Sequence, residues 1–362
     1  MKLIKVPNVH MALPVALDIL DKHGVDRDSR NGPVKMAPWP VITEYLIPQQ
    51  RVLFWPQRNA NPFFHLYESL WMLVGRQDVE PLLRYVKNVI NYSDNGLTFH
   101  GAYGYRWRKH FLSYPDLEAG RDQLKIIVHK LQQNPNDRRG VLQMWDPTID
   151  LGTQGKDIPC NTCATFQINH DGKLELTVFC RSNDIIWGCY GANAVHFSML
   201  QEYMALWIGC PVGPYRQISV NWHAYKDTLE LVKHIPRPPD IKNWYHSTIA
   251  RCPINPYNLD VHYIPMTEAG SISAIKAGIR SLLQDVDRNF KHQGSNLEYA
   301  YDPWSKMVYT VLYAHHLWRN LPAPERYLRS LEVLSSADPT IDWIKAATEW
   351  VQRRYDAWKE KQ

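Results

Sequence analysis

The sequence predicts an α+β fold in which the strands of a sheet are flanked by helices. Two runs that alternate apolar and polar residues lie on either side of Asp171-Gly172, a dipeptide typical of tight hairpin turns. Other segments repeat apolar residues at helical spacing, the clearest being 62–75 and 194–208. Neither an internal repeat nor a disordered linker interrupts the pattern, so we expect one main domain.

Length and composition favour a folded protein with a large core and a small anionic ligand. A chain of 362 residues that is 45% hydrophobic can fill one domain, or one domain with an extension. The formal charge of +5 is mild and comes without a dense basic run, which argues against direct nucleic-acid binding. Six scattered cysteines indicate a reducing compartment.

The sequence also predicts a soluble, cytoplasmic protein that does not contact a membrane. No stretch approaches the roughly 20 apolar residues of a membrane-spanning helix. Residues 1–14 lack the long apolar segment of a signal peptide. For a gene carried by a bacteriophage, the expected location is the cytoplasm of the host.

Three helices are expected in the first half of the chain. Residues 14–24 form a short helix closed by Gly24, and residues 121–133 form an amphipathic helix that ends in a turn. Between them, the apolar segment 62–75 carries one acid, Glu68. A carboxylate in such a setting costs free energy unless it is paired or protonated, so Glu68 is more informative than an acid on a solvated face.

Cys160 follows a proline directly before the hairpin. A thiolate is the side-chain nucleophile best suited to add to an electron-poor ring carbon, such as C6 of a pyrimidine. The alternatives are a buried structural cysteine, or one half of a redox or metal-binding pair with Cys163. A structural zinc site needs four ligands at suitable spacing, and no second pair completes one here. We therefore expect no metal.

Further polar side chains stand where the hairpin ends and the next helix starts. Arg181 and Ser182 follow the return strand, where they can hold a phosphate, although a solvated arginine is the commoner case. Asn193 precedes the helix 194–208. Its amide is either the N-cap of that helix or a group that pairs with the O4 and N3–H edge of uracil.

In this order and near these spacings, the residues resemble the thymidylate synthase and pyrimidine hydroxymethylase family. The match covers roughly residues 20–235 and implies that family's fold, a large mixed sheet flanked by helices. Each motif alone is weak, but the combination is specific. The matching segments are Tyr67-Glu68, Leu70-Trp71, Tyr103-Gly104, Trp107-Arg108, Asp137-Arg138-Arg139, Pro159-Cys160, Arg181-Ser182, Asp184, Gly188, Asn193, His223 and Tyr225.

The resemblance implies catalytic and folate-binding roles. Cys160 would be the nucleophile, and Glu68 would anchor the water network at the base and relay protons. Asp184 would assist catalysis, and it would contact the folate together with Trp71 and Asp157. The one-carbon donor implied is the co-substrate 5,10-methylenetetrahydrofolate.

It also implies the binding of a deoxypyrimidine monophosphate. Asn193 would read the base, which favours dUMP over dCMP, and His223 and Tyr225 would contact the sugar hydroxyl. Because the family donates two arginines across a dimer interface, the resemblance implies a homodimer. The 5′-phosphate would be held by Arg30, Arg181, Ser182 and the partner's Arg138 and Arg139.

One spacing departs from the family. The interval from Gly188 to Asn193 is one residue longer than usual, so Ala192 is an alternative for the base-reading position. Asn193 is preferred because the helix downstream of it aligns without a gap.

Other departures bear on the product. The segment before Tyr103 lacks the tryptophan that shields the reactive methylene in methylating members, and Asn91 or Tyr92 stands in its place. Asp157 replaces an apolar residue against the folate, and Cys180 replaces a glutamine. After a helix expected at 271–292, the chain continues instead of ending in a lid. We therefore expect a catalytic domain at 1–292 and a helical extension at 293–362 packed on it.

These departures favour water over hydride as the group that captures the methylene, because exclusion of water decides between them. The expected activity is thus folate-dependent 5-hydroxymethylation of a deoxypyrimidine monophosphate. A divergent thymidylate synthase that makes a 5-methyl product is the alternative. A non-catalytic nucleotide- or RNA-binding protein is a remote alternative. Such a protein is expected to have lost the nucleophile or the phosphate-binding arginines, and this sequence keeps both.

Overall fold

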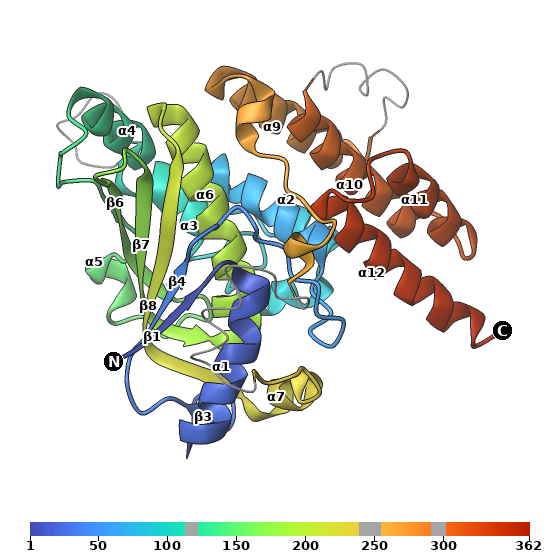
Figure 1. Cartoon of the computed structure of the whole chain (residues 1–362), viewed down its shortest axis with the longest axis horizontal. Coiled ribbons are helices and arrows are strands. Elements are labelled where there is room, and N and C mark those ends of the chain that lie inside the picture. Colours follow the sequence, from blue (N-terminus) through green and yellow to red (C-terminus); the bar gives the residue numbers. More distant parts are fainter. Residues whose placement is uncertain (113–121, 239–254, 291–301) are drawn as a thin grey trace.

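The computed structural model describes residues 1–112, 122–238, 255–290 and 302–362, which form an α+β fold around one mixed sheet of eight strands (Figure 1). Six strands follow the order β1-β4-β8-β7-β6-β5, and β3 pairs with both β8 and β2. The β1–β4 and β7–β8 pairs are parallel, and the others are antiparallel. The strands are β1 Lys2–Val6, β2 Val25–Arg27, β3 Val34–Met36, β4 Val41–Tyr45, β5 Val141–Gln143, β6 Asn161–Ile168, β7 Leu174–Asp184 and β8 Val212–Tyr225.

The hairpin expected at Asp171-Gly172 is confirmed. It joins β6 to β7, which pair from Ile168 opposite Leu174 back to Asn161 opposite Cys180. Gly172 adopts a φ of 74°, a left-handed conformation that costs glycine no steric strain. The register brings the start of β6, just after Cys160, beside the end of β7, where Arg181 and Ser182 lie.

The expected helices are present, with shifted ends. The helix predicted from residue 14 begins at Val9, where the Asn8 side chain caps it. The one predicted at 271–292 ends at Asp287, and residues 291 and 292 lie outside the described part of the chain, as does Arg121 of the segment 121–133. The α-helices are α1 Val9–His23, α2 Pro62–Leu73, α3 Tyr103–Arg108, α4 Gln123–Gln133, α5 Pro147–Asp150, α6 Asn193–Ile208, α7 Lys226–Val232, α9 Ile272–Asp287, α10 Pro303–Asn320, α11 Glu325–Ser335 and α12 Asp342–Lys359.

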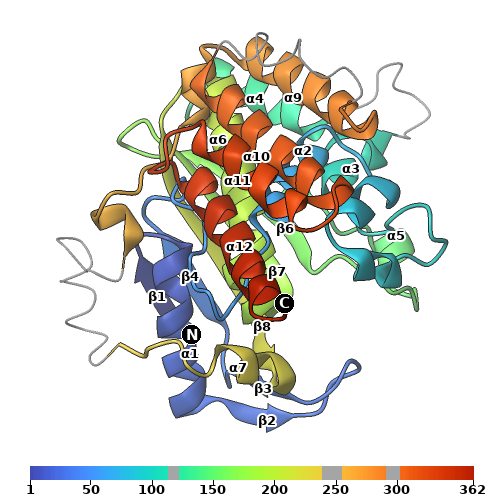
Figure 2. The same cartoon turned by 90° about the vertical axis from the view of Figure 1, so that its right-hand side faces the viewer.

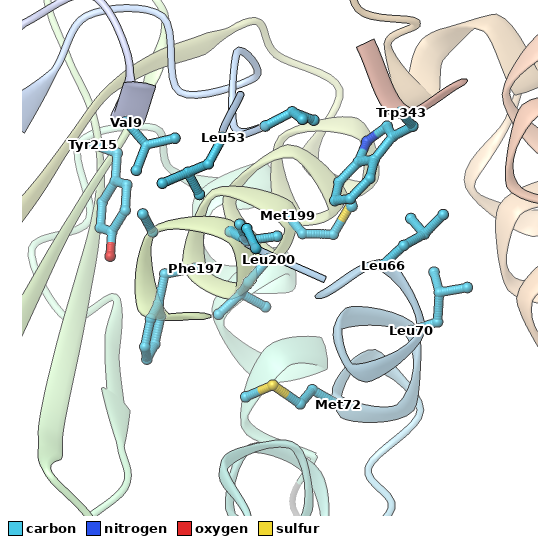
Figure 3. Packing of buried hydrophobic residues seen from close by; sticks show 14 of the residues in the cluster. Val9, Leu53, Leu66, Leu70, Met72, Phe197, Met199, Leu200, Tyr215 and Trp343 are labelled. Carbon is cyan, nitrogen blue, oxygen red and sulfur yellow. The ribbon is translucent and has the colours of Figure 1, made fainter. Parts of the chain in front are cut away.

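Helix α6 is the centre of the core. Its residues Phe197, Met199 and Leu200 are almost fully buried among Leu66 and Leu70 of α2 and residues of the sheet (Figure 3). Helix α2 also packs closely against α3, because a Cβ at Gly104 would stand 2.1 Å from the Met72 carbonyl oxygen. Only glycine fits there, so the Tyr-Gly motif fixes the approach of α3 to α2.

The C-terminal helices share this core. Trp343 of α12 is buried beside Met199 (Figure 3), and the ring of Trp350 lies 5.3 Å from that of Phe63 on α2. In Figure 2, α10, α11 and α12 lie together in front of the strands. The boundary predicted at 292/293 lies outside the described residues, and the division into 1–292 and 293–362 stays a prediction.

In the part of the chain that the structure describes, one face of the sheet is left open. Helices α1, α2 and α6 lie on the other side (Figure 1), where Ile4, Val178 and Ala164 are buried. Strand pairing aligns Leu3, Ile42, Ile218, Phe179 and Cys163 across the open face. Leu3, Phe179 and Val220 are exposed there by 53%, 37% and 61%. Apolar surface of this kind, extending over several strands, is typical of a protein interface.

Among the helices of the described residues, none has the length and apolar character that crossing a membrane requires.

Candidate active site

Two neighbouring cavities contain most of the polar residues selected from the sequence. The larger, of about 570 Å³, is lined by Arg30, Arg181, Ser182, His223 and Tyr225, with Trp145 and Ile158. The smaller, of about 200 Å³, is lined by Glu68, Trp71, Tyr92, Asp157, Asn193 and His196. Ile158 lines one cavity and Asp157 the other, and Cys160 follows two residues later. Cys160 itself lines neither cavity.

Tyr103 fixes the backbone of Cys160. Its hydroxyl oxygen accepts hydrogen bonds from the backbone N–H groups of Cys160 and Asn161, each at 3.0 Å. From the neighbouring strand β7, the N–H of Arg181 donates to the Cys160 carbonyl oxygen at 2.8 Å. Burial raises the pKa of the Cys160 thiol, and the guanidinium of Arg181 opposes that rise. Deprotonation of Cys160 therefore depends on the positive charge beside it.

Arg181 also holds the segment before Cys160 in place. Its Nε donates to the Pro159 carbonyl oxygen at 2.9 Å and one terminal nitrogen donates to the Ile158 carbonyl oxygen at 3.1 Å. The guanidinium lies 5.6 Å from the centre of the Trp145 ring. Because a guanidinium has five N–H groups, others remain for an anion in the larger cavity. Arg181 thus couples the phosphate candidate site to the position of the thiol.

Arg30 reaches the same cavity from an exposed turn. Ser29 and Gly32 close that turn, with the Ser29 hydroxyl donating to the Gly32 carbonyl oxygen at 2.6 Å. Gly32 has a φ of 121°, which favours glycine. The loop expected from the sequence thus places a cation opposite Arg181 and Ser182.

A chain of side-chain amides sets the orientation of Asn193. Gln217 donates from Nε2 to the Cys189 carbonyl oxygen at 3.1 Å, so its Oε1 must face Asn183. Asn183 donates to that oxygen at 3.1 Å and accepts from Asn193 Nδ2 at 3.0 Å. Asn193 Oδ1 in turn accepts from Asn161 at 3.1 Å. The Cys189 carbonyl oxygen can only accept a hydrogen bond, so it fixes the orientation of the Gln217 amide. The orientations of the Asn183 and Asn193 amides follow from that of Gln217.

These contacts exclude the N-cap alternative for Asn193. It is the first residue of α6, and its side chain bonds to Asn161 and Asn183 and makes no cap. The preceding segment Ile185–Ala192 is π-helical at its start, but the backbone of Tyr190 and Gly191 is not helical. The longer interval after Gly188 therefore contains a kink before α6. A Cβ at Gly188 would lie 2.9 Å from Asn183 Oδ1, so glycine leaves room for the amides.

Glu68 lies on α2 and faces the smaller cavity. Its Oε2 is 3.0 Å from His196 Nε2 on α6, with side-chain exposures of 18% for Glu68 and 5% for His196. Trp71, one helical turn further along α2, is held by its indole N–H, which donates to Asp78 at 3.2 Å. Asp78 itself pairs with Arg76. The helix thus presents an acid and a flat apolar ring to one cavity.

The two aspartates expected at the folate are placed differently. Asp157 lines the smaller cavity, and one of its oxygens accepts from the Gly101 N–H at 2.7 Å. Asp184 caps the π-helix by accepting from Ile186 N–H at 3.0 Å, and it lines neither cavity. Burial raises the pKa of both carboxyls. Across the β7–β8 ladder, Asp184 is paired with His223.

Arg138 and Arg139 are not brought to either cavity of their own chain. They lie exposed in the turn between α4 and β5. The guanidinium of Arg139 is bound to Asp137, with one N–H to Oδ2 at 2.6 Å and Nε to Oδ1 at 3.0 Å.

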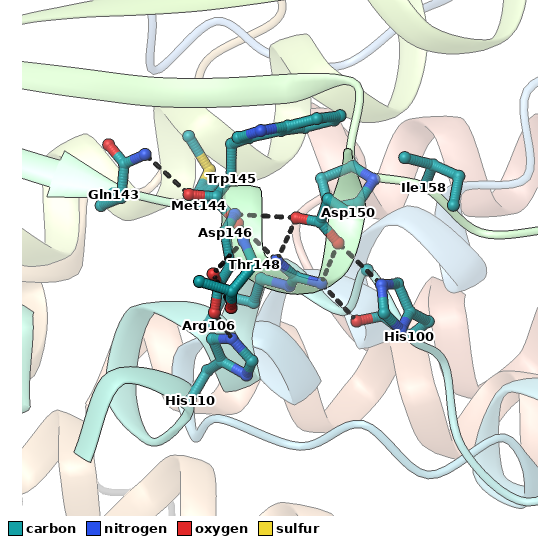
Figure 4. Close-up of polar contacts among 12 residues, drawn as sticks. His100, Arg106, His110, Gln143, Met144, Trp145, Asp146, Thr148, Asp150 and Ile158 are labelled. Carbon is teal, nitrogen blue, oxygen red and sulfur yellow. Dashed lines mark hydrogen bonds and ion pairs between the residues drawn. The ribbon is translucent and has the colours of Figure 1, made fainter. Parts of the chain in front are cut away.

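A buried polar cluster holds the segment that leads to Cys160 (Figure 4). Asp150 accepts from Arg106 at 2.6 and 2.9 Å, from the Asp146 N–H at 2.8 Å, and lies 2.7 Å from His100 Nε2. Arg106 and Asp150 side chains are both fully buried. Burial would raise the pKa of Asp150, but the hydrogen bond from Arg106 keeps it below its ordinary value.

Sequence reasoning missed four residues of the site: Tyr103 as a contact of Cys160, the amides of Asn161 and Asn183, and His196. Asn161 is adjacent to the nucleophile candidate, and His196 stands three residues after Asn193 on the same helix face. Those spacings were the available signals. The described residues contain no group of three His, Cys, Asp or Glu side chains arranged to hold a metal ion.

Comparison with known proteins identifies a family and several relatives of the chain. The family model of thymidylate synthase matches residues 17–244. The chain is 45% identical to a deoxyuridylate hydroxymethyltransferase of Pseudomonas phage M6, over 100% of this chain and 97% of that protein. Proteins of the same description from Bacillus phage SP01 and Delftia phage PhiW-14 are 41% and 29% identical, over 50% and 53% of their lengths.

The matched range 17–244 contains Glu68, Cys160 and Asn193, and it includes most of the sheet and the central helix α6. The chain belongs to the thymidylate synthase family.

Proposed function

We propose that the protein transfers a one-carbon unit to C5 of dUMP and delivers it as a hydroxymethyl group. The observation that carries this proposal is the lining of the smaller cavity, where the polar Asp157 and Tyr92 stand beside Glu68. The names of the phage relatives, deoxyuridylate hydroxymethyltransferases, support it. Their phage origin suits the cytoplasm of an infected cell, where nucleotide and folate are available.

The larger cavity would hold the phosphate and sugar of the nucleotide. Arg30 and Arg181 supply positive charge, and Ser182 supplies a hydroxyl. His223 and Tyr225 lie next to each other on the same wall, with ring centres 5.4 Å apart, and can contact a sugar hydroxyl. A nucleotide bound this way would place its base towards Cys160 and Asn193.

The smaller cavity suits a flat co-substrate ring as well as the base. Trp71 and Phe99 form an aromatic wall with ring centres 6.2 Å apart. We propose 5,10-methylenetetrahydrofolate as the co-substrate, which supplies a one-carbon unit at the oxidation level of formaldehyde. Trp71 and Asp157 would line its site, and Asp184 would orient the π-helix beside it and reach the folate only from that cap position.

Cys160 would act as the nucleophile. Its thiolate adds to C6 of the base, and the electron pair of the C5–C6 bond makes C5 reactive towards the one-carbon unit. Glu68 would assist loss of the C5 proton and expulsion of tetrahydrofolate, which together leave an exocyclic methylene on the ring. The remaining question is whether hydride or water adds to that methylene.

The cavity favours water. Tyr92 is 59% exposed and lines the cavity, whereas Asn91, the other residue considered for this place, does not line it. No indole from this segment covers the methylene position, and Asp157 offers oxygen atoms to water there. Since about 1.4 kcal/mol of relative barrier changes a product ratio tenfold, modest access of water is sufficient.

A homodimer would complete the phosphate site. The open face of the sheet, with Leu3, Phe179 and Val220 exposed, is suited to pair with a second copy. Arg138 and Arg139 lie outside the cavities of their own chain and would enter the partner's larger cavity. Arg139 would have to share its guanidinium between Asp137 and the phosphate.

The function is tested by the products of the purified protein. With dUMP and methylenetetrahydrofolate, we expect a nucleotide heavier by one CH₂O unit, measured by mass spectrometry, and no dihydrofolate by absorbance. Thymidylate with an equal amount of dihydrofolate would establish a divergent thymidylate synthase instead. Nucleotide binding without turnover would leave only a nucleotide-binding protein.

Base preference gives a second test. The amide chain directs Asn193 so that its free N–H can face O4 and its free lone pair can face N3–H of uracil. An aspartate accepts only, which suits the N4 amino group of cytosine. We expect Asn193→Asp to shift the ratio of kcat/KM for dCMP over dUMP by at least about 100-fold.

The matched control is Asn221→Asp in the larger cavity. Its added charge would weaken binding of both nucleotides through the phosphate, and should leave the ratio between them unchanged. A wild-type protein that already prefers dCMP would contradict the assignment of Asn193.

A further inference from the structure

His196 and Glu68 form a pair at the wall of the smaller cavity. They come from α6 and α2, and Nε2 of the histidine lies 3.0 Å from Oε2 of the glutamate. Both line the cavity with Asn193 and Asp157. The glutamate is the more exposed of the two, 18% against 5%, so it is the member that water can reach.

The position of His196 is fixed by the core. Helix α6 is buried on nearly all sides, and His196 stands three residues after Asn193, on the same face. Its ring packs edge-on to that of His65 on α2, with centres 6.4 Å apart. These contacts place the imidazole on the same helix face as Asn193, next to Glu68.

Water capture needs such a pair. When the oxygen of water bonds to the exocyclic methylene, one O–H proton must leave, and the electrons of the methylene double bond pass into the ring as an enolate. The enolate then expels the Cys160 thiolate, which restores the C5–C6 double bond. Because neutral water is a weak nucleophile, a base within reach of it lowers the barrier to the first of these steps.

We propose that His196 is a positioning residue for this step, a proposal that rests on the hydroxymethylation proposed above. His196 Nε2 lies against Oε2 of Glu68 at 3.0 Å, an ion-pair distance without the geometry of a hydrogen bond, and this contact leaves Oε1 to take the proton of the attacking water. A carboxylate fixed through one oxygen keeps the other in a set direction, whereas an unpaired one rotates about its terminal bond. His196 thereby favours water over hydride after the methylene has formed, while the earlier loss of the C5 proton needs only Glu68.

The test separates the two stages within one reaction. His196→Gln keeps a polar side chain of similar length, but a flexible amide replaces the rigid ring that stands against Oε2 of Glu68. With dUMP tritiated at C5, release of tritium reports formation of the methylene. We expect tritium release within about threefold of the wild type, and at least a tenfold fall in hydroxymethyl product per tritium released.

The amount of hydroxymethyl product per tritium released does not depend on how much of the variant is folded, because only active molecules release tritium or form product. His315→Gln is the matched control, since it removes a buried imidazole on α10 that lines neither cavity of the site. It should leave the ratio unchanged. An unchanged ratio in His196→Gln, or tritium release and product lost together, would overturn the proposal. A wild type that makes only thymidylate would instead overturn the proposed function.

Discussion

Replacing Cys160 by serine is expected to lower turnover by at least about 10⁴-fold while dUMP still binds. A serine hydroxyl stays protonated near neutral pH and lacks the nucleophilicity of a thiolate, so addition to C6 fails. Binding should change by less than about threefold, because the proposed phosphate contacts come from Arg30, Arg181 and Ser182 in the larger cavity. Isothermal titration of dUMP and a product assay measure the two quantities.

Cys163→Ser is the matched control. Cys163 lies in β6, three residues after Cys160, and it is opposite Phe179 on the open face of the sheet. Its side chain therefore points away from the cavities, and most activity should remain. An inactive Cys163→Ser together with an active Cys160→Ser would move the nucleophile to the other residue and contradict the mechanism.

The parts of the structure predicted from the sequence are those specified by local pattern. Asp171-Gly172 determines a turn whose geometry needs few neighbours, and the alternation on either side sets which residues of β6 and β7 face the core. The ends of helices were less accurate. Pro14 was expected to start a helix, but the buried run from Val9 and the cap at Asn8 extend it upstream, and proline is tolerated inside its second turn.

The features of the site that the sequence did not predict depend on contacts between residues far apart in the chain. Gln217 and Asn161 lie 56 positions apart, and nothing in their neighbourhoods indicates that amides join them through Asn183 and Asn193. The ion-pair distance between Glu68 and His196 likewise joins two helices. For the segment before α6, the sequence indicated only that one residue is added. Its backbone conformation depends on the cap at Asp184 and on Arg58, which donates a hydrogen bond to the Ile186 carbonyl oxygen.

The C-terminal helices illustrate the same limit. Their amphipathic pattern predicted packing on the parent fold, but it could not identify the contact. Trp343 enters the core beside Met199, and Asp342 accepts a hydrogen bond from Tyr257 at 2.8 Å. Burial raises the pKa of Asp342 to about 7, so a buried acid, and not only apolar surface, joins α12 to the rest of the chain.

The second large effect expected is on stability, from Asp150→Ala. The change leaves the guanidinium of Arg106 fully buried without its carboxylate, which costs about 3–5 kcal/mol of unfolding free energy in comparable pairs. It also frees the backbone N–H of Asp146 and the ring of His100. Urea denaturation of the wild type and the variant measures the difference.

Activity should fall further than the loss of folded protein explains, because the cluster fixes the segment from Trp145 to Ile158 that borders the larger cavity (Figure 4). Glu332→Ala is the control at a surface pair with Arg329, where exposure and screening leave little to lose. Replacing both buried partners, Arg106→Met with Asp150→Leu, should destabilise less than Asp150→Ala alone, since no charge is then left unpaired. If the double variant is the less stable of the two, packing and not the unpaired charge determines the cost.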